Sequence, residues 1–226
     1  MKKIRIHDLV NFNKKSERSK ITQVNNFKKE IPEVEKNKKD SGGDYWISCN
    51  SALIKYFKTE DTKVLNHKIE HLKSMIDNTP RKQTKDRFNS NIDRINNFIS
   101  FNIKEIKPSE EIKILKKEEK YPKLKINDLT IEVKPDIIYS FNDDEIGSVW
   151  FITKKGGFKS NELAMFCDIN FRYLTKVYSE KHNINTDFVT VIDVFNTSYM
   201  TYSQIKDGEI ISPLNNTIEE FKKLLR

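Results

Sequence analysis

The chain has 226 residues, a length typical of one domain or of one domain with an appendage. Lys and Arg number 41 against 33 Asp and Glu, a net charge of +8, and no apolar run is long enough to cross a membrane. No apolar core of a secretion signal follows Met1-Lys2-Lys3, so we expect a cytoplasmic protein, and Cys49 and Cys167 alone exclude a disulfide framework or a four-cysteine metal site.

The positive charge is concentrated at the front of the chain. Residues 1–40 contain twice as many basic as acidic side chains, whereas residues 129–226 contain more acidic than basic ones. A basic segment of this kind is typical of proteins that contact phosphate groups, and it is also found on solvated surfaces with no ligand. The charge pattern therefore favours nucleic acid as a partner without requiring it.

Residues 1–43 predict a basic polar arm. The stretch from Asn11 is rich in Lys and Asn and closes with Ser41-Gly42-Gly43, a composition typical of mobile segments. The helical spacing of Ile21, Val24 and Phe27 leaves a short docked helix open. We expect residues 44–226 to form a single α+β domain, with a helical part over 44–107 and a sheet-containing part over 108–226.

Three helices are predicted in the helical part. Leu53, Ile54 and Phe57 share one helical face, and two further stretches repeat the apolar spacing of about 100° per residue. The second ends near Thr79-Pro80, because the residue before proline resists the α conformation. The apolar stripes of the second and third helices are Leu65, Ile69, Leu72 and Ile76, then Phe88, Ile92, Ile95 and Ile99.

The second of these helices contains His67-Lys-Ile-Glu70-His71, which matches the inverted zinc-peptidase signature H-x-x-E-H. The helical wheel places both histidines nearly opposite the apolar stripe. This position predicts a surface pair of histidines rather than a zinc site.

The sequence period then changes from 3.6 to 2. Alternation over 124–126 and 129–133, separated by Asn127-Asp128, predicts two strands and a tight turn. We expect Ile137 to Phe141 to continue the second strand past Pro135, and Ser148 to Thr153 to form the third.

A long helix is predicted from Ser160, which can cap it, to Leu174 and beyond. Asp187 to Phe195 shows little alternation, as expected of a strand that is covered on both faces. The capping box Thr217-Ile-Glu-Glu220 predicts the start of a last short helix.

The resulting order of elements, α-β-β-β-α-β, resembles the core of the PD-(D/E)XK nuclease superfamily, the fold of restriction endonucleases, with a central mixed sheet. The resemblance covers most of residues 45–200. It implies an Asp, often preceded by Pro, on the second core strand, and an acid and a Lys two residues apart on the third. Pro135-Asp136 matches the first position and Lys154 the last, which implies a Mg²⁺-dependent phosphodiesterase with Asp136 as metal ligand and Lys154 beside the reacting phosphate.

The chain departs from the family pattern at Ile152, where the second acid is expected. Glu132 is a substitute ligand, because Glu132, Lys134 and Asp136 share one face of a strand by period two. Four residues of strand span about 13 Å, so Glu132 reaches the ion at Asp136 only if the chain bends near Pro135.

Two other interpretations of this stretch stay open. Glu132-Val-Lys134 can itself be the acid-x-Lys motif, with Asp128, Glu118 or Glu119 as the upstream acid. Alternatively, the three ionic side chains are the solvated face of an antiparallel strand.

Basic side chains elsewhere are expected to contact phosphates without base specificity. We therefore expect a protein that acts on nucleic acid, and analogy with the family suggests a setting in phage defence or a mobile element. The alternative is an inactive nuclease-fold module that binds nucleic acid or a protein partner. That partner includes a second copy of the chain. The expected phosphate contacts are Arg81, Lys82, Lys85, Arg87, Lys14, Lys15 and Arg18.

Overall fold

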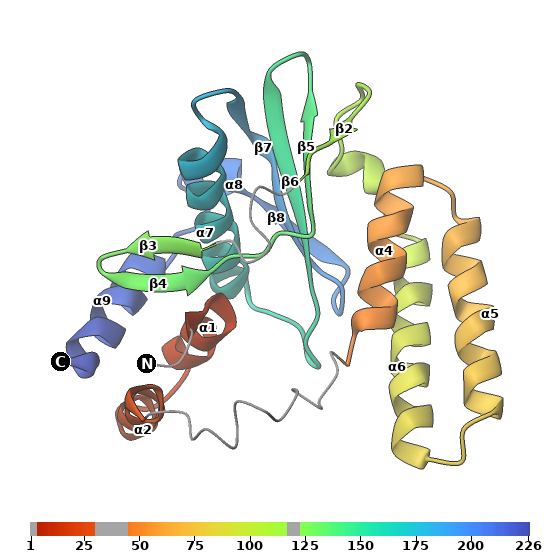
Figure 1. Cartoon of the computed structure of the whole chain (residues 1–226), viewed down its shortest axis with the longest axis horizontal. Helices are drawn as coiled ribbons and strands as arrows, with labels where there is room; N and C mark the ends of the chain where they lie inside the picture. The colour runs from red at the N-terminus through yellow and green to blue at the C-terminus, as the bar shows by residue number, and fades with distance from the viewer. Residues whose placement is uncertain (1–3, 30–44, 117–122) are drawn as a thin grey trace.

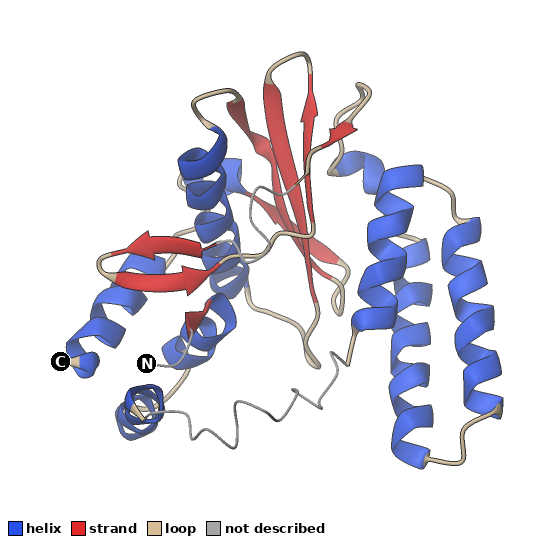
Figure 2. Ribbon diagram, in the orientation of Figure 1, coloured by secondary structure: helices blue, strands red, loops and turns tan. Residues whose placement is uncertain are grey.

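The structure is a computed structural model that describes residues 4–29, 45–116 and 123–226. A five-stranded mixed sheet lies between two groups of helices (Figures 1 and 2). Its strands follow the order β2-β5-β6-β7-β8, in which only β6 and β7 are parallel. The strands are β2 (Lys113–Ile114), β5 (Ile137–Phe141), β6 (Glu145–Ile152), β7 (Asn183–Asp193) and β8 (Ser198–Thr201).

Helix α7 (Ser160–Tyr178) connects the parallel strands β6 and β7 and covers one face of the sheet. Trp150 and Ile152 of β6 pack on this side, whereas Val149 and Phe151 belong to the apolar cluster on the other face. This alternation confirms that the sheet is covered on both faces. The helix begins at Ser160 and its N-cap is Lys159, one residue earlier than predicted.

The three helices predicted over this part of the chain are present as α4 (Ile47–Thr59), α5 (Lys63–Asp77) and α6 (Lys82–Ile99), which pack together on the second face of the sheet (Figure 1). A single 3₁₀ turn (Ile103–Glu105) follows α6. One residue of each apolar stripe, Leu53, Leu65 or Ile95, is fully buried in the shared core. The third stripe is wrong at its end, where Ile99 is exposed and Phe98 is buried in its place. His67 and His71 are exposed on α5, as the helical wheel predicts.

The hairpin β3 (Lys123–Ile126) and β4 (Leu129–Glu132) belongs to a second, three-stranded sheet with β1 (Ile4–Arg5). Asn127 and Asp128 both have positive φ, which fits the tight hairpin turn predicted there. The expectation that 137–141 continues the same strand is wrong. The chain leaves the small sheet after Glu132 and enters the large sheet at Ile137.

The N-terminal segment is part of the fold and not an arm over the residues that the structure describes. It contains β1, α1 (Ile6–Asn13) and α2 (Glu17–Lys28), and both helices pack against the last helix, α9 (Leu214–Leu225). Ile4, Leu9 and Phe12 are completely buried. The mobile-arm prediction is therefore wrong for residues 4–29, whose apolar side chains complete the core beside α7. The docked helix left open at Ile21, Val24 and Phe27 is confirmed as α2, in which Val24 is fully buried, and residues 30–43 lie outside the described part.

The last helix begins earlier than the capping box predicts. Helix α9 starts at Leu214, so Thr217 lies inside it and its hydroxyl donates to the Pro213 carbonyl at 2.8 Å. A short helix, α8 (Tyr202–Lys206), precedes it. Within residues 4–29, 45–116 and 123–226, no helix combines the length and apolar character needed to span a membrane.

Candidate functional site

The start of β5 and the end of β6 lie side by side in the large sheet and carry two of the predicted site residues. Ile137 pairs with Val149, and Asp136, just before β5, accepts a hydrogen bond from the backbone N–H of Phe151 at 2.8 Å. Lys154 follows two residues after the end of β6. The tertiary structure thus brings Asp136 to the end of the strand that leads into Lys154.

Ile152 occupies the place where the nuclease resemblance implies a second carboxylate. Its side chain is only 2 % exposed and belongs to the same apolar cluster as Phe166 and Leu163 of α7. An acid introduced there would be buried among apolar side chains, so the position is shaped for packing rather than for holding a cation.

Glu132 and Lys134 do not share a strand with Asp136. Glu132 ends β4 in the small sheet, opposite Lys123 on one side and Arg5 on the other. Lys134 is exposed in the connection between the two sheets. The three side chains therefore do not share the predicted strand face, because the chain passes from one sheet to the other between Glu132 and Ile137.

The described residues do not offer a donor set that fits a Mg²⁺ centre. Within residues 4–29, 45–116 and 123–226, no group of three or more His, Cys, Asp or Glu side chains is arranged to hold a metal ion. One oxygen of Asp136 already accepts a backbone N–H, and Asp128 pairs instead with Lys222 and Lys125 at the hairpin turn. The alternative acids Glu118 and Glu119 lie outside the described residues.

A cationic group forms at this edge of the sheet from segments that are far apart in the sequence. Lys14, at the end of α1, forms an ion pair with Glu162, which is buried in the first turn of α7. The side chain of Lys154 lies against Lys14. This close neighbour lowers the pKa of Lys154, partial burial lowers it further, and Glu162 and Asp193 act in the opposite direction.

Lys159 lines the same hollow, so three lysines stand against the carboxylates of Glu162 and Asp193 and leave the group with a positive balance. The Lys154 ammonium also lies 5.3 Å from the centre of the Phe158 ring, and that of Lys14 lies 5.9 Å from it. A ring face attracts cations, so Phe158 holds both charges at the same place. Like charges this close are unfavourable until an anion neutralises them.

The turn after β6 approaches the end of β7 closely. Gly156 and Gly157 have φ values of 86° and 69°, and a Cβ on Gly157 would lie 1.9 Å from the Asn196 amide nitrogen. Glycine is favoured at position 157 because its φ is positive and a Cβ there would displace the side chains of Asn196 and Asp193.

Asp193, at the end of β7, fixes this turn. It is completely buried, and its carboxylate accepts the backbone N–H groups of Phe158 and Phe195 at 2.8 and 2.9 Å and the amide of Asn196 at 2.9 Å. Three donors satisfy the buried charge. Asp193 is therefore a positioning residue for the segments on either side of it.

The cationic group opens into a hollow of about 480 Å³, which we call the lysine pocket. Residues of the glycine turn and of the first turn of the 19-residue helix α7 line it. Helix N-termini favour negative charge. The lysine pocket is lined by Asn13, Lys14, Lys154, Gly156, Gly157, Phe158, Lys159, Asn161 and Glu162.

No protein-family model, curated protein or solved structure matches this chain. Its function is therefore inferred from the chemistry of its own side chains. The lysine pocket has the chemistry of a site for an anion such as phosphate.

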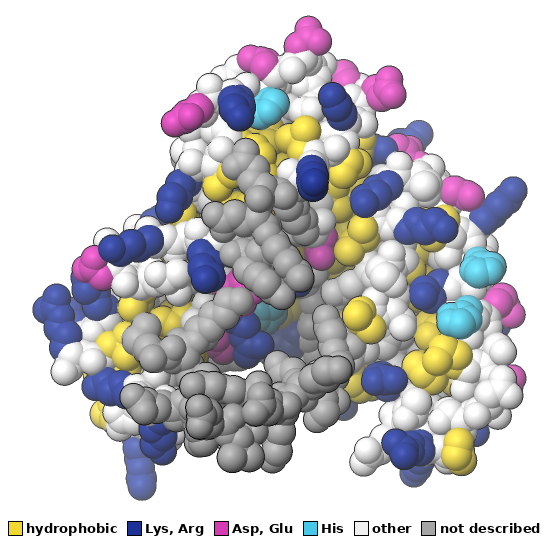
Figure 3. All heavy atoms as spheres, in the orientation of Figure 1, with side chains coloured by type: hydrophobic (Ala, Val, Ile, Leu, Met, Phe, Trp, Pro, Cys, Tyr) yellow, Lys and Arg dark blue, Asp and Glu magenta, His cyan; other side chains and the backbone are white. Residues whose placement is uncertain are grey.

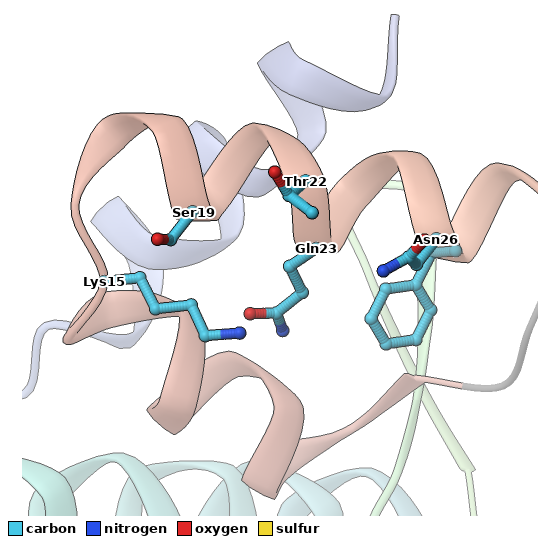
Figure 4. Close-up of a pocket in the computed structure, with 6 residues that line it drawn as sticks. Lys15, Ser19, Thr22, Gln23 and Asn26 are labelled. Carbon is cyan, nitrogen blue, oxygen red and sulfur yellow. The ribbon is translucent and has the colours of Figure 1, made fainter.

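A second hollow, of about 450 Å³, lies between α1 and α2 (Figure 4). Lys15 and the Gln23 amide point into it, and Gln23 donates to the Asp8 carbonyl at 2.9 Å. Its other lining side chains are neutral: Ser19, Thr22, Asn26 and Phe27. A single lysine makes this hollow a weaker anion site than the lysine pocket.

The basic residues predicted to contact phosphates are divided between two parts of the structure. Lys14, Lys15 and Arg18 lie on or after α1 and at the start of α2, whereas Arg81, Lys82, Lys85 and Arg87 lie in the first turns of α6. Lysine and arginine side chains accordingly stand out on both flanks of the face in Figure 3. Of the predicted set, Lys14 lies in the same pocket as Lys154.

Sequence reasoning missed Glu162 and Asp193. A signal was present for each: Asp193 is the only acid in the apolar run Val189–Phe195, and a lone acid in a buried strand requires partners. Glu162 is the acid expected in the first turn of a helix, and its carboxylate accepts the Lys159 backbone N–H at 3.1 Å. Its ion pair with Lys14 depends on tertiary structure.

Proposed function

We propose that this chain binds nucleic acid through the sugar-phosphate backbone, with one phosphate in the lysine pocket. The observation that carries the proposal is the apposition of Lys14 and Lys154, which line the same hollow and whose ammonium groups lie 5.9 and 5.3 Å from the centre of the same Phe158 ring. An anion between the two ammonium groups removes their repulsion and gains two charge-assisted contacts. Phosphodiesters carry such an anion at every nucleotide, and they match the positive net charge of +8.

The basic residues on α2 and on the first turns of α6 support an extended ligand over a small one. Arg18, Arg81 and Lys82 are exposed, and they belong to helices on opposite sides of the large sheet. A chain of phosphates can contact both groups as well as the pocket. Such contacts position the ligand and carry no base specificity.

Binding is favoured over cleavage because Ile152 occupies the place of one metal ligand and Asp136, the other, already accepts a backbone hydrogen bond. A phosphodiesterase of the PD-(D/E)XK type requires two carboxylates near the lysine, and here one place is taken by a buried isoleucine. The chain is then a nuclease-like module that holds the phosphate without a metal ion.

Mg²⁺-dependent cleavage is the second candidate, and one observation favours it. Asp136 bonds to the strand that ends just before Lys154, the relation between acid and lysine that the superfamily resemblance implies.

The test measures binding of a labelled mixed-sequence oligonucleotide at several salt concentrations, with and without Mg²⁺. We expect binding in the presence of a chelator, with log affinity falling linearly with log salt. Lys154→Met should weaken binding and reduce the slope by about one. An unchanged slope in this variant would refute the lysine pocket as the phosphate site, and cleavage of the oligonucleotide only with Mg²⁺ would select the phosphodiesterase instead.

A further inference from the structure

A third hollow, of about 540 Å³, lies on the other side of the glycine turn and is lined by aromatic side chains. We call it the aromatic pocket. Tyr45 and Trp46 enter it from the start of α4, Arg94 from α6, and Phe195 from the segment after β7. Ser90, Asp93 and Lys155 complete its lining.

The aromatic rings in this pocket are accessible. Tyr45 is 42 % exposed, and Trp46 and Phe195 are each partly exposed. Tyr45 and Trp46 meet edge to face with ring centres 4.7 Å apart, so neither ring is stacked flat on the other. The Tyr45 hydroxyl donates to the Ser90 hydroxyl at 3.1 Å, which orients its ring at the rim.

The guanidinium of Arg94 adds a second flat surface. It lies 4.1 Å from the centre of the Phe195 ring and donates to the Phe195 backbone carbonyl at 3.0 Å. Aromatic faces and arginine planes are the surfaces on which proteins stack unpaired bases. The Asp93 carboxylate, at the same pocket, is an acceptor for the amino and imino groups at the edge of a base.

The aromatic pocket and the lysine pocket are physically linked. Lys154 lines one and Lys155 lines the other, and consecutive Cα atoms are only about 3.8 Å apart. Asp193 binds the backbone N–H of Phe158 on the first side and of Phe195 on the second. A phosphate on one side of the turn and its base on the other can therefore be held together.

We propose that the aromatic pocket takes one unstacked nucleobase, so that the chain binds single-stranded nucleic acid in preference to a duplex. The proposal rests on the proposed function, since it assigns the base that belongs to a backbone held by the lysine pocket. The volume lies in the range of roughly 300–1,000 Å³ found for small-molecule sites. A base in a duplex is already stacked on both faces, so it reaches these rings only after unpairing.

The experiment compares a labelled single-stranded oligonucleotide of mixed sequence with its matched duplex, using the full chain. Binding is followed by anisotropy, and stacking by quenching of tryptophan fluorescence. The chain has two tryptophans, and Trp150 is only 7 % exposed in the core, so stacking quenches Trp46. We expect about tenfold tighter binding of the single strand, with quenching by the single strand alone.

Tyr45→Ala should lower affinity for the single strand by roughly five- to 150-fold, the range that corresponds to the stacking of one base. Tyr45→Ala should leave the affinity for the duplex unchanged. Tyr45→Phe, which keeps the aromatic ring, should bind the single strand in preference to the duplex as the wild type does. Ile47→Ala is the matched control, because Ile47 is a 63 % exposed apolar residue that does not line the pocket. Far-ultraviolet circular dichroism and Trp150 emission verify that each variant is folded.

The outcomes separate the two proposals. Equal affinity for both forms without quenching, or equal loss of both in Tyr45→Ala, overturns the base pocket and leaves backbone binding in place. A chain that binds neither form at low salt overturns the proposed function and the base pocket together.

Discussion

The carboxylate of Asp136 accepts a hydrogen bond from the backbone N–H of Phe151 at 2.8 Å, one step beyond the last pair of the β5–β6 ladder. Asp136 therefore has a structural role whether or not it meets a ligand. Removing the carboxylate leaves a partly buried N–H without its acceptor, and bonds to charged groups contribute about 1.5–3 kcal/mol.

We expect Asp136→Ala to lower the free energy of unfolding by about 1.5–3 kcal/mol in urea denaturation. Lys134→Ala, at an exposed position in the same connection, should change it by no more than about 0.5 kcal/mol. Equal stability of Asp136→Ala and wild type would show that Asp136 is only part of a solvated face.

The two lysines of the lysine pocket should differ in their effect on stability. Lys14→Met leaves the buried Glu162 without its ion-pair partner, so the variant should be clearly destabilised. Lys154→Met removes a like charge beside Lys14 and should be neutral or stabilising at pH 7. Both should weaken nucleic-acid binding, whereas Lys181→Met, an exposed lysine beyond the other end of α7, should not.

The dependence on pH follows from the lowered pKa of Lys154. The folded state binds the Lys154 proton less readily than the unfolded state does, so the charged lysine lowers the free energy of unfolding. This loss of stability is complete below the pKa of Lys154 in the folded state, and it disappears as the pH rises toward 10.5, the pKa in the unfolded state. The stability gained in Lys154→Met should accordingly shrink between neutral pH and 10.5, measured by denaturation at stepped pH. A gain that grows with pH would contradict the lysine apposition.

Gly156 and Gly157 form a matched pair for testing the glycine turn. Both have positive φ, so alanine at either position has the same backbone cost, of about 1–2 kcal/mol. A Cβ at 157 would also meet the Asn196 amide at 1.9 Å and the Asp193 carboxylate at 2.7 Å, whereas a Cβ at 156 meets nothing within 4 Å. Gly157→Ala should therefore unfold at a lower denaturant concentration and bind the oligonucleotide more weakly than Gly156→Ala.

Deletion of residues 1–29 tests the correction to the arm prediction. Ile4, Leu9 and Phe12 are buried beside α7 and α9, so we expect the truncated chain to lose its cooperative thermal transition. Phe12→Ala in the full chain should cost about 3–5 kcal/mol. Retention of the full transition temperature after deletion would restore the view that this segment is an arm.

The sequence by itself determined the elements whose apolar pattern has one strong period. The helices around Leu53, Leu65 and Ile95 and the hairpin turn at Asn127-Asp128 are confirmed, because amphipathic spacing and turn chemistry act over a few residues. The sequence did not predict strand β1, because this strand forms only through the pairing of Ile4 with Ile131, which is far away in the sequence. For the same reason the Lys- and Asn-rich composition of residues 4–29 concealed the role of their eight apolar side chains, several of which make the segment part of the core.

The candidate site was determined in part by the sequence and in part by the tertiary structure. Sequence indicated Asp136, Lys154 and Lys14 one at a time, from a strand pattern and from charge. Tertiary structure decided that Lys14 meets Lys154 and Glu162, that Glu132 lies in a different sheet from Asp136, and that Asp193 joins the two pockets. The physical reason is that local periodicity fixes which face of an element a side chain occupies, whereas charges from distant segments meet only where packing of the core brings those faces together.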